Sequence, residues 1–521
     1  MTATSICSAN GVNNSIEVSR PALSLSRSRA GRWRAVRGID TSRPPRYQLR
    51  RSILGAPNAT VAQLVEQRLR GPELVASNPV GGSSDLHTMP FEASLPPSLE
   101  HSPSVEVTSS PLRVAILSYR SAPNVGGQGV YVEYLSRALV AFGHKVDVIS
   151  GPPYPNLDPA VGRIELPSLD LYAQPHLGHY ALRPKHLRSA TDTYEYFGHL
   201  SGKLVEPYTF GRRAYQYLSQ HRSDYDVILD NQCLAEGTLR VQTRLGLPLV
   251  TVIHHPITQD RRLALEAEPR LRRRLLIRRW YAFHRMQIRV ARRLHTIISP
   301  SECARAHVAE EFGVDRTRIK AIPLGIDRSF FKPNPAVKRR PNRVVTTASA
   351  DTPLKGLRFL VEAYSKLLDT HPDLELVVIG RPRKGGTSKQ IRELGLADKV
   401  QFKSGLSREQ LAREFQTATM LVSPSLYEGF GLPAAEAMSC GTPVIVTDGG
   451  ALPEVAGNAG VVVAKGDAGA LQHAIAGLLD DPERREAVAA ACLKRAEDTF
   501  NWRSIAPIYD AVLRDAISAA C

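Results

Sequence analysis

The sequence predicts an α/β protein with two doubly wound, Rossmann-like domains that face each other across a cleft. Two series of short runs rich in Val, Ile and Leu alternate with stretches of helical periodicity, which is typical of parallel sheets covered by helices. A Pro- and Lys-rich link, Phe331–Asn342, separates the two series. At 521 residues the chain is also too long for one hydrophobic core. We expect an N-terminal domain at 109–332, a C-terminal domain at 333–498, and a final helix at 499–521 that packs back towards the N-terminal domain.

Residues 1–108 are predicted to be a mostly disordered basic extension. Residues 1–88 hold 12 Arg, no Lys and 5 acidic residues in a Ser-, Pro- and Gly-rich composition that cannot build a packed core. An organelle transit peptide and a basic arm for nucleic acid both fit this composition. Residues Ala62–Val80 also resemble the peptide obtained when a transfer-RNA gene is translated. We therefore expect Met89 to be the natural start.

Composition excludes several classes of protein. No stretch of apolar residues is long enough for a membrane-spanning helix, and no apolar core of a secretory signal follows the N-terminus. The six cysteines have no metal-binding spacing, as expected of free thiols in a reducing compartment. These observations predict a cytoplasmic protein.

The N-terminal domain begins with a βαβ unit. Arg113–Tyr119 reads as a strand, a loop with Gly126 and Gly127 follows, and apolar residues then recur at helical spacing until Gly143. The second strand is predicted at Lys145–Ser150. Such glycines let a ligand approach the backbone, and the helix N-terminus favours an anion, although the loop is not a dinucleotide fingerprint.

Polar side chains follow the later strands of this domain. The strands are predicted at Asp226–Gln232, Pro248–His255, His295–Ser301 and Ile319–Asp327, and their carboxyl ends carry Asn231, Gln232, His254, His255 and Ser301. Ligands of open α/β sheets bind at this edge. Adjacent strand residues point to opposite faces, so we expect His254 rather than His255 to face the cleft.

The segment Pro269–His295 is predicted to be one basic amphipathic helix. It contains ten Arg and no acidic residue, and Leu271, Leu275, Met286 and Val290 fall at helical spacing. Three interpretations stay open: contact of residues 270–293 with an anionic membrane surface, pairing of the arginines with acids elsewhere, and contact with nucleic acid.

The C-terminal domain repeats the strand and helix alternation. Its strands are predicted at Arg343–Ala350, Leu374–Gly380, Val400–Gly405, Thr419–Ser425, Pro443–Asp448 and Gly460–Ala464. Lys355 precedes a helix and can meet a phosphate there, and Arg381 adds positive charge past another strand end.

Two carboxylates flank a Gly-Phe-Gly turn in this domain. Glu428 lies in a loop, and Glu436 lies about one turn inside the helix predicted at Leu432–Ser439. The positive end of that helix favours Glu436 as a charged carboxylate, which can accept hydrogen bonds from vicinal hydroxyls. An acid–base pair for glycosidic chemistry and ordinary surface glutamates are the other interpretations.

The combined motifs point to a family. They are "NVGGQGVYVEYLSRALVAFGHKVDVIS", "TVIHH", "PLGID", "LKGL", "VVIGRP", "PSLYEGFGLPAAEAMSCGTPVIVTDGGALPEV" and "FNW". From about Val114 onwards the chain resembles the retaining family-4 glycosyltransferases of the GT-B fold. The resemblance implies transfer of a sugar from a nucleotide-diphosphate sugar to an acceptor hydroxyl, with retention of configuration and without a metal or other cofactor. It also implies that the N-terminal domain binds the acceptor and the C-terminal domain the nucleotide sugar.

The resemblance also assigns roles to residues. His254 and Glu428 are the implied catalytic residues, and the implied donor-binding residues are Gly126, Gly127, Lys355, Arg381, Gly429, Phe430, Gly431, Leu432 and Glu436. Glu436 would hold the ribose, Lys355 the diphosphate, and Glu428, His254 and the Gly-Phe-Gly amides the sugar. The sequence departs from the family at Ser349 and Ala350, where an arginine is usual before the lysine. Two alternatives follow: Arg381 or Lys384 replaces that second phosphate contact, or the donor phosphates are held less tightly.

Other functions remain open at this point. A GT-B sugar-nucleotide epimerase would share the fold, and a catalytically silent nucleotide-sugar-binding protein would explain the missing arginine. Nucleic acid is not an expected partner, because it leaves the paired cleft motifs unexplained. The Arg-rich segment suggests a lipid-linked acceptor and a peripheral position on the inner face of a membrane.

Overall fold

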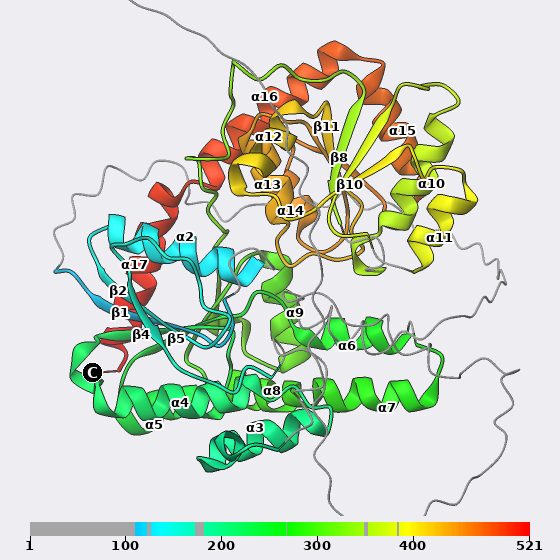
Figure 1. Ribbon diagram of the computed structural model, residues 1–521. Helices are drawn as coiled ribbons and strands as arrows, with labels where there is room; N and C mark the ends of the chain where they lie inside the picture. Colours follow the sequence, from blue (N-terminus) through cyan, green and yellow to red (C-terminus); the bar gives the residue numbers. More distant parts are fainter. Residues whose placement is uncertain are drawn as a thin grey trace, which may run out of the picture. The chain divides into compact units, whose positions relative to one another are not determined.

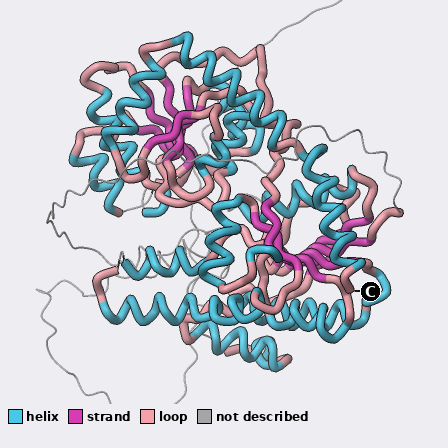
Figure 2. Tube along the Cα trace, turned by 180° about the vertical axis from the view of Figure 1, so that it is seen from behind, coloured by secondary structure: helices cyan, strands magenta, loops and turns pink. Residues whose placement is uncertain are grey.

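The computed structural model contains two parallel sheets, each covered by helices on both faces (Figures 1 and 2). The structure describes residues 110–121, 127–171, 182–266, 268–348, 353–382 and 385–520. All of these residues belong to a single unit of the chain by their contacts. The predicted α/β class with two doubly wound sheets is therefore confirmed. The predicted extension 1–108 and the residues Gly126, Ser349, Ala350 and Lys384 lie outside the described residues.

The N-terminal sheet has seven parallel strands in the order β3-β2-β1-β4-β5-β6-β7. The strands are β1 (Arg113–Ser118), β2 (Lys145–Ser150), β3 (Gly162–Glu165), β4 (Val227–Asn231), β5 (Leu249–Val252), β6 (Thr296–Ser299) and β7 (Ile319–Ala321). Its helices are α2 (Gly127–Ala141), α3 (Ala190–Leu200), α4 (Glu206–Gln220), α5 (Glu236–Leu245), α6 (Ile257–Glu266), α7 (Leu271–Trp280), α8 (His284–Ala291) and α9 (Glu302–Phe312). The short edge strand β3 was not predicted, because its four residues are only partly buried and carry no apolar run.

Both faces of this sheet are buried. Along β1, Val114 and Ile116 join one hydrophobic cluster with α2, whereas Ala115 and Leu117 join a second cluster with α4 and α5. Strand side chains alternate between the two faces, so a sheet covered on both sides needs a continuous apolar run. That need explains the sequence of β1, "RVAILS".

The C-terminal sheet has six parallel strands in the order β10-β9-β8-β11-β12-β13. The strands are β8 (Arg343–Thr347), β9 (Glu375–Ile379), β10 (Val400–Lys403), β11 (Met420–Ser423), β12 (Val444–Thr447) and β13 (Val461–Val463). The helices are α10 (Leu357–Leu367), α11 (Gly386–Glu393), α12 (Arg408–Thr417), α13 (Leu432–Ser439), α14 (Leu452–Ala456), α15 (Ala468–Leu479), α16 (Pro482–Thr499) and α17 (Trp502–Ser518).

The last helix, α17, packs on the N-terminal sheet rather than on the sheet that precedes it in sequence. It contacts α2, β4 and β5. The hydroxyls of Tyr131 in α2 and Tyr509 in α17 lie 2.9 Å apart in a buried hydrogen bond. A parallel bridge between Ile326 and Asn501 fixes the start of the helix beside the link between the two sheets.

The predicted single helix at Pro269–His295 is wrong in part. The segment forms α7 and α8, separated by the 3-10 turn Tyr281–Phe283. Trp280, Tyr281 and Phe283 pack with Leu204 in a separate small core, and this aromatic anchor interrupts the helix. Met286, Val290 and Leu294 are buried in the core of the sheet, so the exposed part of the segment is mainly α7.

The described helices include none that is both long and apolar enough to cross a lipid bilayer.

Candidate active site

The loop between β11 and α13 brings two predicted site residues together. Nζ of Lys355 lies 2.5 Å from Oε1 of Glu428, which also accepts a hydrogen bond of 2.7 Å from the Ser425 hydroxyl. Lys355 ends the 3-10 turn before α10, and the amide of Leu426 donates to the carbonyl of Leu354 at 2.7 Å. The predicted phosphate-binding lysine and sugar-facing glutamate are therefore ion-paired with each other. A bound sugar donor would have to break this pair or form hydrogen bonds to both side chains.

The stretch "GGALPE", Gly449–Glu454, holds this loop in place from its other side. The amide of Glu428 donates to the carbonyl of Gly449 at 3.2 Å, and the amide of Ala451 donates to the carbonyl of Glu428 at 2.9 Å. A side chain at Gly450, which has a φ of 70°, would overlap the carbonyl oxygen of Glu428. The glycine therefore lets two backbones approach closely enough to fix the position of Glu428.

Two helix N-termini meet beside the loop. Gly431 is the N-cap of α13, and the side chain of Leu432 lies next to Gly127 at the start of α2. The phenyl ring of Phe430 points into the core, edge-on to Phe500 with ring centroids 5.6 Å apart. The backbone of Phe430 is thus the part that can face a ligand. Two converging positive helix ends provide a favourable place for an anionic group.

Glu436 is buried and does not behave as predicted. It is 7% exposed, and burial raises the pKa of its carboxyl to about 8, although the charge of Arg408 acts in the opposite direction. Desolvation therefore raises the pKa more than the positive end of the helix lowers it. The expectation that Glu436 is a charged carboxylate is wrong for the protein without a bound sugar donor. Burial raises the pKa of the Tyr134 hydroxyl of α2, and the nearby Glu436 carboxyl raises it further.

An ion pair closes the side of the site next to Glu436. Arg408 of α12 forms a bidentate pair with Glu133 of α2 and places its guanidinium carbon 4.7 Å from the centre of the Tyr134 ring. Arg408 thus connects the C-terminal sheet's helices to α2.

On the N-terminal sheet, His254 lies just beyond β5 and is almost fully buried. Burial, with a smaller effect of the neighbouring His255 in the same direction, lowers the pKa of its imidazole to about 3. Its ring packs edge-on against Tyr131 at 4.7 Å between centroids. Because β5 ends at Val252, the argument from alternating strand faces does not apply to either histidine. His254 is a neutral imidazole at physiological pH.

The hydrogen bonds around His254 define its tautomer. Its Nε2 lies 2.7 Å from Oδ1 of Asn231, whose Nδ2 donates to the Ser118 hydroxyl at 3.2 Å. Since Ser118 donates its own proton to the carbonyl of Arg120, it can only accept from Asn231. The amide oxygen of Asn231 therefore faces the ring, His254 carries its proton on Nε2, and Nδ1 keeps a lone pair.

His255, which was less expected than His254 to face the cleft, also belongs to the site. Burial lowers the pKa of its imidazole, but the charge of Asp260, a hydrogen bond to it and the charge of Glu428 together raise the pKa above its usual value. Its Nε2 lies 3.0 Å from the Asp260 carboxylate. Sequence reasoning missed it because Asp260 is brought to it by the first turn of α6.

The polar edges of the two sheets touch. A side chain at Gly429 would lie 2.6 Å from the carbonyl oxygen of His254. The Ser301 hydroxyl donates to the carbonyl of Gly429 at 2.9 Å. Glu454 accepts the amides of Glu302 and Cys303, at 2.8 and 2.6 Å, and so caps α9 from the other sheet. Glu454 is the acid of the "GGALPE" stretch, and that motif was the signal that could have identified it.

Arg381 is the predicted site residue that the structure does not bring into this cluster. It is exposed just beyond β9, and no contact to Lys355 or Glu428 is found for it among the described residues. The replacement for the usual arginine is thus not identified by these contacts. Within the described part of the chain, no three His, Cys, Asp or Glu side chains gather as a candidate metal site.

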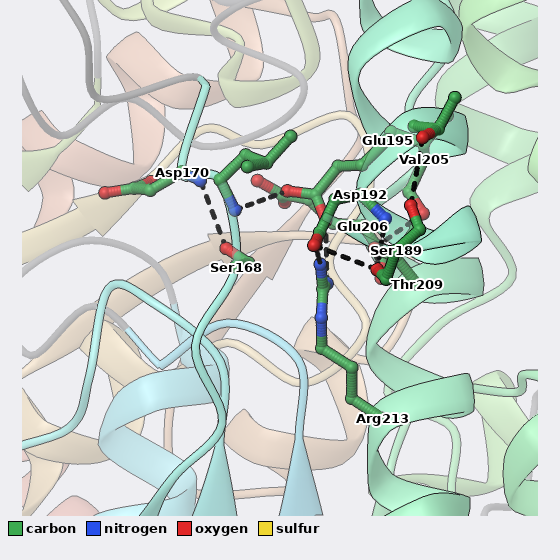
Figure 3. A network of polar contacts seen from close by, with 11 residues as sticks. Ser168, Asp170, Ser189, Asp192, Glu195, Val205, Glu206, Thr209 and Arg213 are labelled. Carbon is green, nitrogen blue, oxygen red and sulfur yellow. Dashed lines mark hydrogen bonds and ion pairs between the residues drawn. The ribbon is translucent and has the colours of Figure 1, made fainter. Parts of the chain in front are cut away.

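A second polar network lies on the N-terminal side (Figure 3). Arg213 of α4 pairs with Glu195 and Asp192 of α3, each at 2.6 Å, and Glu195 also accepts the amide of Leu169 at 2.9 Å. Nearby, Glu206 is 8% exposed, and burial raises the pKa of its carboxyl to about 7 while Arg120, 3.7 Å away, lowers it. This network ties α3 and α4 to the segment that follows β3.

Two family profiles match the chain over both sheets. The profile described as Glycosyltransferase Family 4 matches residues 125–330, and the profile described as Glycosyl transferases group 1 matches residues 329–495. The two ranges meet at the link between the sheets. Together with the parallel sheets, the matches define a glycosyltransferase of the GT-B fold.

Relatives give the family. The MMP α-(1→4)-mannosyltransferase of Mycolicibacterium hassiacum is 42% identical over 417 residues, which cover 79% of this chain and 100% of the relative. The D-inositol 3-phosphate glycosyltransferase 2 of Catenulispora acidiphila is 27% identical over 427 residues, 76% of this chain and 93% of the relative. The chain belongs to glycosyltransferase family 4.

Solved structures share the fold. Sucrose-phosphate synthase from Thermosynechococcus elongatus superposes with a TM-score of 0.58 at 24% identity, over 78% of this chain and 100% of its own. HepE from Anabaena, solved with UDP and glucose, has a TM-score of 0.56 at 15% identity, with 78% and 100% coverage. The Mycolicibacterium and Catenulispora relatives are both named as transferases of sugars, so neither the epimerase nor the silent binding protein is favoured.

Proposed function

We propose that the protein transfers mannose from a nucleotide-diphosphate mannose to the 4-hydroxyl of an acceptor sugar, with retention of configuration. The observation that carries this proposal is the 42% identity over the entire length of an MMP α-(1→4)-mannosyltransferase. The relatives named for D-inositol 3-phosphate are less similar, at 27% identity for the Catenulispora protein.

The site geometry supports a donor between the two sheets. We propose that the diphosphate accepts hydrogen bonds from Lys355, since its ammonium has three N–H groups and the structure shows only one of them bonded to Glu428. The amides of Gly429, Phe430, Gly431 and Leu432, with Gly127 beside Leu432 at the start of α2, would receive the remaining negative charge. The free carboxylate of Glu428 and Nδ1 of neutral His254 would then accept hydrogen bonds from the hydroxyls of the sugar.

The ribose would lie against Glu436. Vicinal hydroxyls donate to a carboxylate, so their arrival would favour loss of the Glu436 proton that burial retains. We propose that no metal takes part. Lys355 and the two helix N-termini supply the positive charge that a departing diphosphate requires. Arg381 would add to this positive charge only if its side chain moved towards the bound diphosphate.

We propose a cytoplasmic location, since the four described cysteines, Cys233, Cys303, Cys440 and Cys492, are all free thiols. The acceptor is proposed to be a sugar rather than nucleic acid, and a lipid-linked sugar is included among the candidates.

A transfer assay tests the proposal. The protein is incubated with GDP-mannose, UDP-mannose, GDP-glucose or UDP-glucose and with mannose oligosaccharides or D-inositol 3-phosphate as acceptor. We expect a product that is one hexose heavier from a nucleotide mannose and a mannose acceptor, with an α linkage by one-bond carbon–proton coupling and undiminished yield in EDTA. A β linkage, transfer to D-inositol 3-phosphate alone, or an epimerised sugar formed without acceptor would contradict the proposal.

A further inference from the structure

Exposed apolar side chains gather on α3 and α7, away from the active site. Ten large apolar residues stand out as exposed in the described part of the chain, and eight of them lie within 182–200 or 271–276. On α3 they are Tyr194, Phe197 and Leu200, which are 37%, 52% and 36% exposed. On α7 they are Leu271, Leu275 and Leu276, which are 69%, 54% and 50% exposed. Contiguous apolar surface of this kind marks a place of interaction.

The two rows of side chains lie on neighbouring elements. The amide of Leu204, just after α3, donates to the carbonyl of Trp280 at the end of α7 at 3.4 Å, and the guanidinium of Arg279 donates to the carbonyl of Ser201. Figures 1 and 2 both show α3 beside the line formed by α7 and α8. We call the six apolar residues named above the α3–α7 face.

Neither helix needs this face to hold its place in the fold. The inward side of α7 already buries Ile277 and Trp280 in the small core with Leu204. The inward side of α3 buries Glu195, Tyr196 and His199. The rings of Tyr194 and Phe197 do touch those of Tyr208 and Tyr196. The α3–α7 face nevertheless remains exposed apolar surface in addition to the buried sides of the two helices.

The charge around the α3–α7 face is strongly positive. Arg272 and Arg278 are exposed on α7, and Arg183 and Arg188 are exposed just before α3. The helix α7 contains no acidic residue, and the acids of α3, Asp192 and Glu195, are held by Arg213. Glu268, just before α7, pairs with Arg273 at 3.6 Å, and no ion pair is found for Arg183, Arg188, Arg272 or Arg278 among the described residues. The surface thus combines exposed leucines and aromatics with an excess of exposed arginines.

We propose that the α3–α7 face docks on an anionic lipid bilayer. Leucines and a phenylalanine enter the boundary between headgroups and acyl chains, while the flanking arginines bind the lipid phosphates. A second copy of this chain fits less well, because a two-fold interface would set these arginines against their own equivalents. The proposal does not depend on the donor or the acceptor of the transfer reaction.

The test is flotation of the full chain with vesicles. The protein is mixed with vesicles of phosphatidylcholine alone or of phosphatidylcholine with phosphatidylglycerol, at low and at high salt. We expect flotation with the anionic vesicles only, and less of it at high salt because surface charge is screened. Equal flotation with both kinds of vesicle, or none with either, would overturn the proposal.

Surface variants locate the contact. The triple variant Leu271→Ser, Leu275→Ser, Leu276→Ser should lose flotation, and Arg272→Gln with Arg278→Gln should weaken partitioning about fivefold for each removed charge. The matched controls are Leu394→Ser with Val462→Ser, the other two exposed apolar residues, and Arg413→Gln, an exposed arginine of α12. The controls should float like the wild type.

Two outcomes would assign the face to another role. If the leucine variant floats like its control, the membrane contact lies elsewhere and the proposal is wrong. If light scattering shows that the wild type is a dimer and the leucine variant a monomer, the face is an interface between copies. Circular dichroism and transfer to a water-soluble acceptor should be unchanged in every variant, since all of these side chains are exposed.

Discussion

The two sheets present their site residues in different ways. On the C-terminal sheet, one continuous stretch from Ser425 to Glu436 supplies the loop, the helix N-terminus and both carboxylates. On the N-terminal sheet, His254 is held by side-chain hydrogen bonds that link it to Asn231 and Asn231 to Ser118. These two residues end β4 and β1. Site residues that are contiguous in the sequence can be recognised there as a motif. Site residues that come from the ends of several strands appear in the sequence only as scattered polar residues.

The contrast extends to electrostatics. Burial keeps the imidazole of His254 neutral and the carboxyl of Glu436 protonated, so the two sides of the site present a neutral base and a neutral acid when no donor is bound. Lys355 and Glu428 form the charged pair near the middle. A ligand that brings negative charge would therefore disturb the C-terminal side more than the N-terminal side.

The largest expected effect is at Lys355. Lys355→Ala removes the cation beside the proposed diphosphate and leaves Glu428 without its partner, so kcat/KM for transfer should fall about 10²–10³-fold. The matched control is Lys366→Ala in α10, where the lysine is exposed and pairs with Glu362 at 3.0 Å. Steady-state kinetics measure both. Equal activity of the two variants would show that the C-terminal loop does not carry the phosphate contact.

The second prediction concerns the proton on Glu436. If the ribose binds the ionised carboxylate, donor binding near neutral pH must release a proton, because the pKa of about 8 keeps the free site protonated. Calorimetry in buffers of different ionisation enthalpy should show this release in the wild type. Glu436→Gln should abolish it and weaken donor binding about tenfold to a hundredfold, as expected for a lost hydrogen bond to a charged group.

Glu206→Gln is the control for this experiment, since Glu206 is equally buried but lies in the network of Figure 3. Its proton release on donor binding should match that of the wild type. If the wild type binds the donor tightly but its binding enthalpy does not depend on the buffer, Glu436 does not bind the ribose as an ionised carboxylate.

The third prediction sharpens the N-terminal side. Asn231→Asp places a carboxylate against Nε2 of His254, so the pKa of the imidazole should rise from about 3 by about 1–3 units. Asn231→Leu removes the acceptor without adding charge, and kcat should fall about tenfold. Nitrogen-15 NMR of the histidines should show the Nε2–H tautomer in the wild type and a mixture of tautomers in Asn231→Leu. An unchanged His254 signal in both variants would contradict a positioning role for Asn231.

The smallest effect is expected for the stability of the N-terminal network. The pKa of Glu206 is about 7 in the folded protein and lower when unfolded, so the folded state holds the proton more tightly. Its contribution to the free energy of unfolding is therefore greatest at low pH and declines as the pH rises towards and past 7. Glu206→Gln should make Tm less dependent on pH between about pH 5 and pH 8, by roughly 2–4 °C. Thermal melts over this range test it, and parallel curves would contradict it.

Much of the fold could be predicted because buried parallel strands must be continuously apolar. The strand Lys145–Ser150 and the helix Leu432–Ser439 were predicted to the residue. The edge strand β3 was missed, since a short strand at the edge needs no such run. The break in the Arg-rich segment was missed because it depends on Leu204, which lies far away in the sequence.

The sequence by itself determined the α/β class, the family and the Glu428–Glu436 stretch, because local periodicity and a contiguous motif do not depend on distant partners. The tertiary structure decided the ionisation and the pairing of the site residues. Burial protonates Glu436, Asn231 orients His254, and Glu428 holds Lys355. The structure also decided which apolar residues of α7 stay exposed. Such properties depend on desolvation and on neighbours brought together from separate strands, and no local pattern of residues records them.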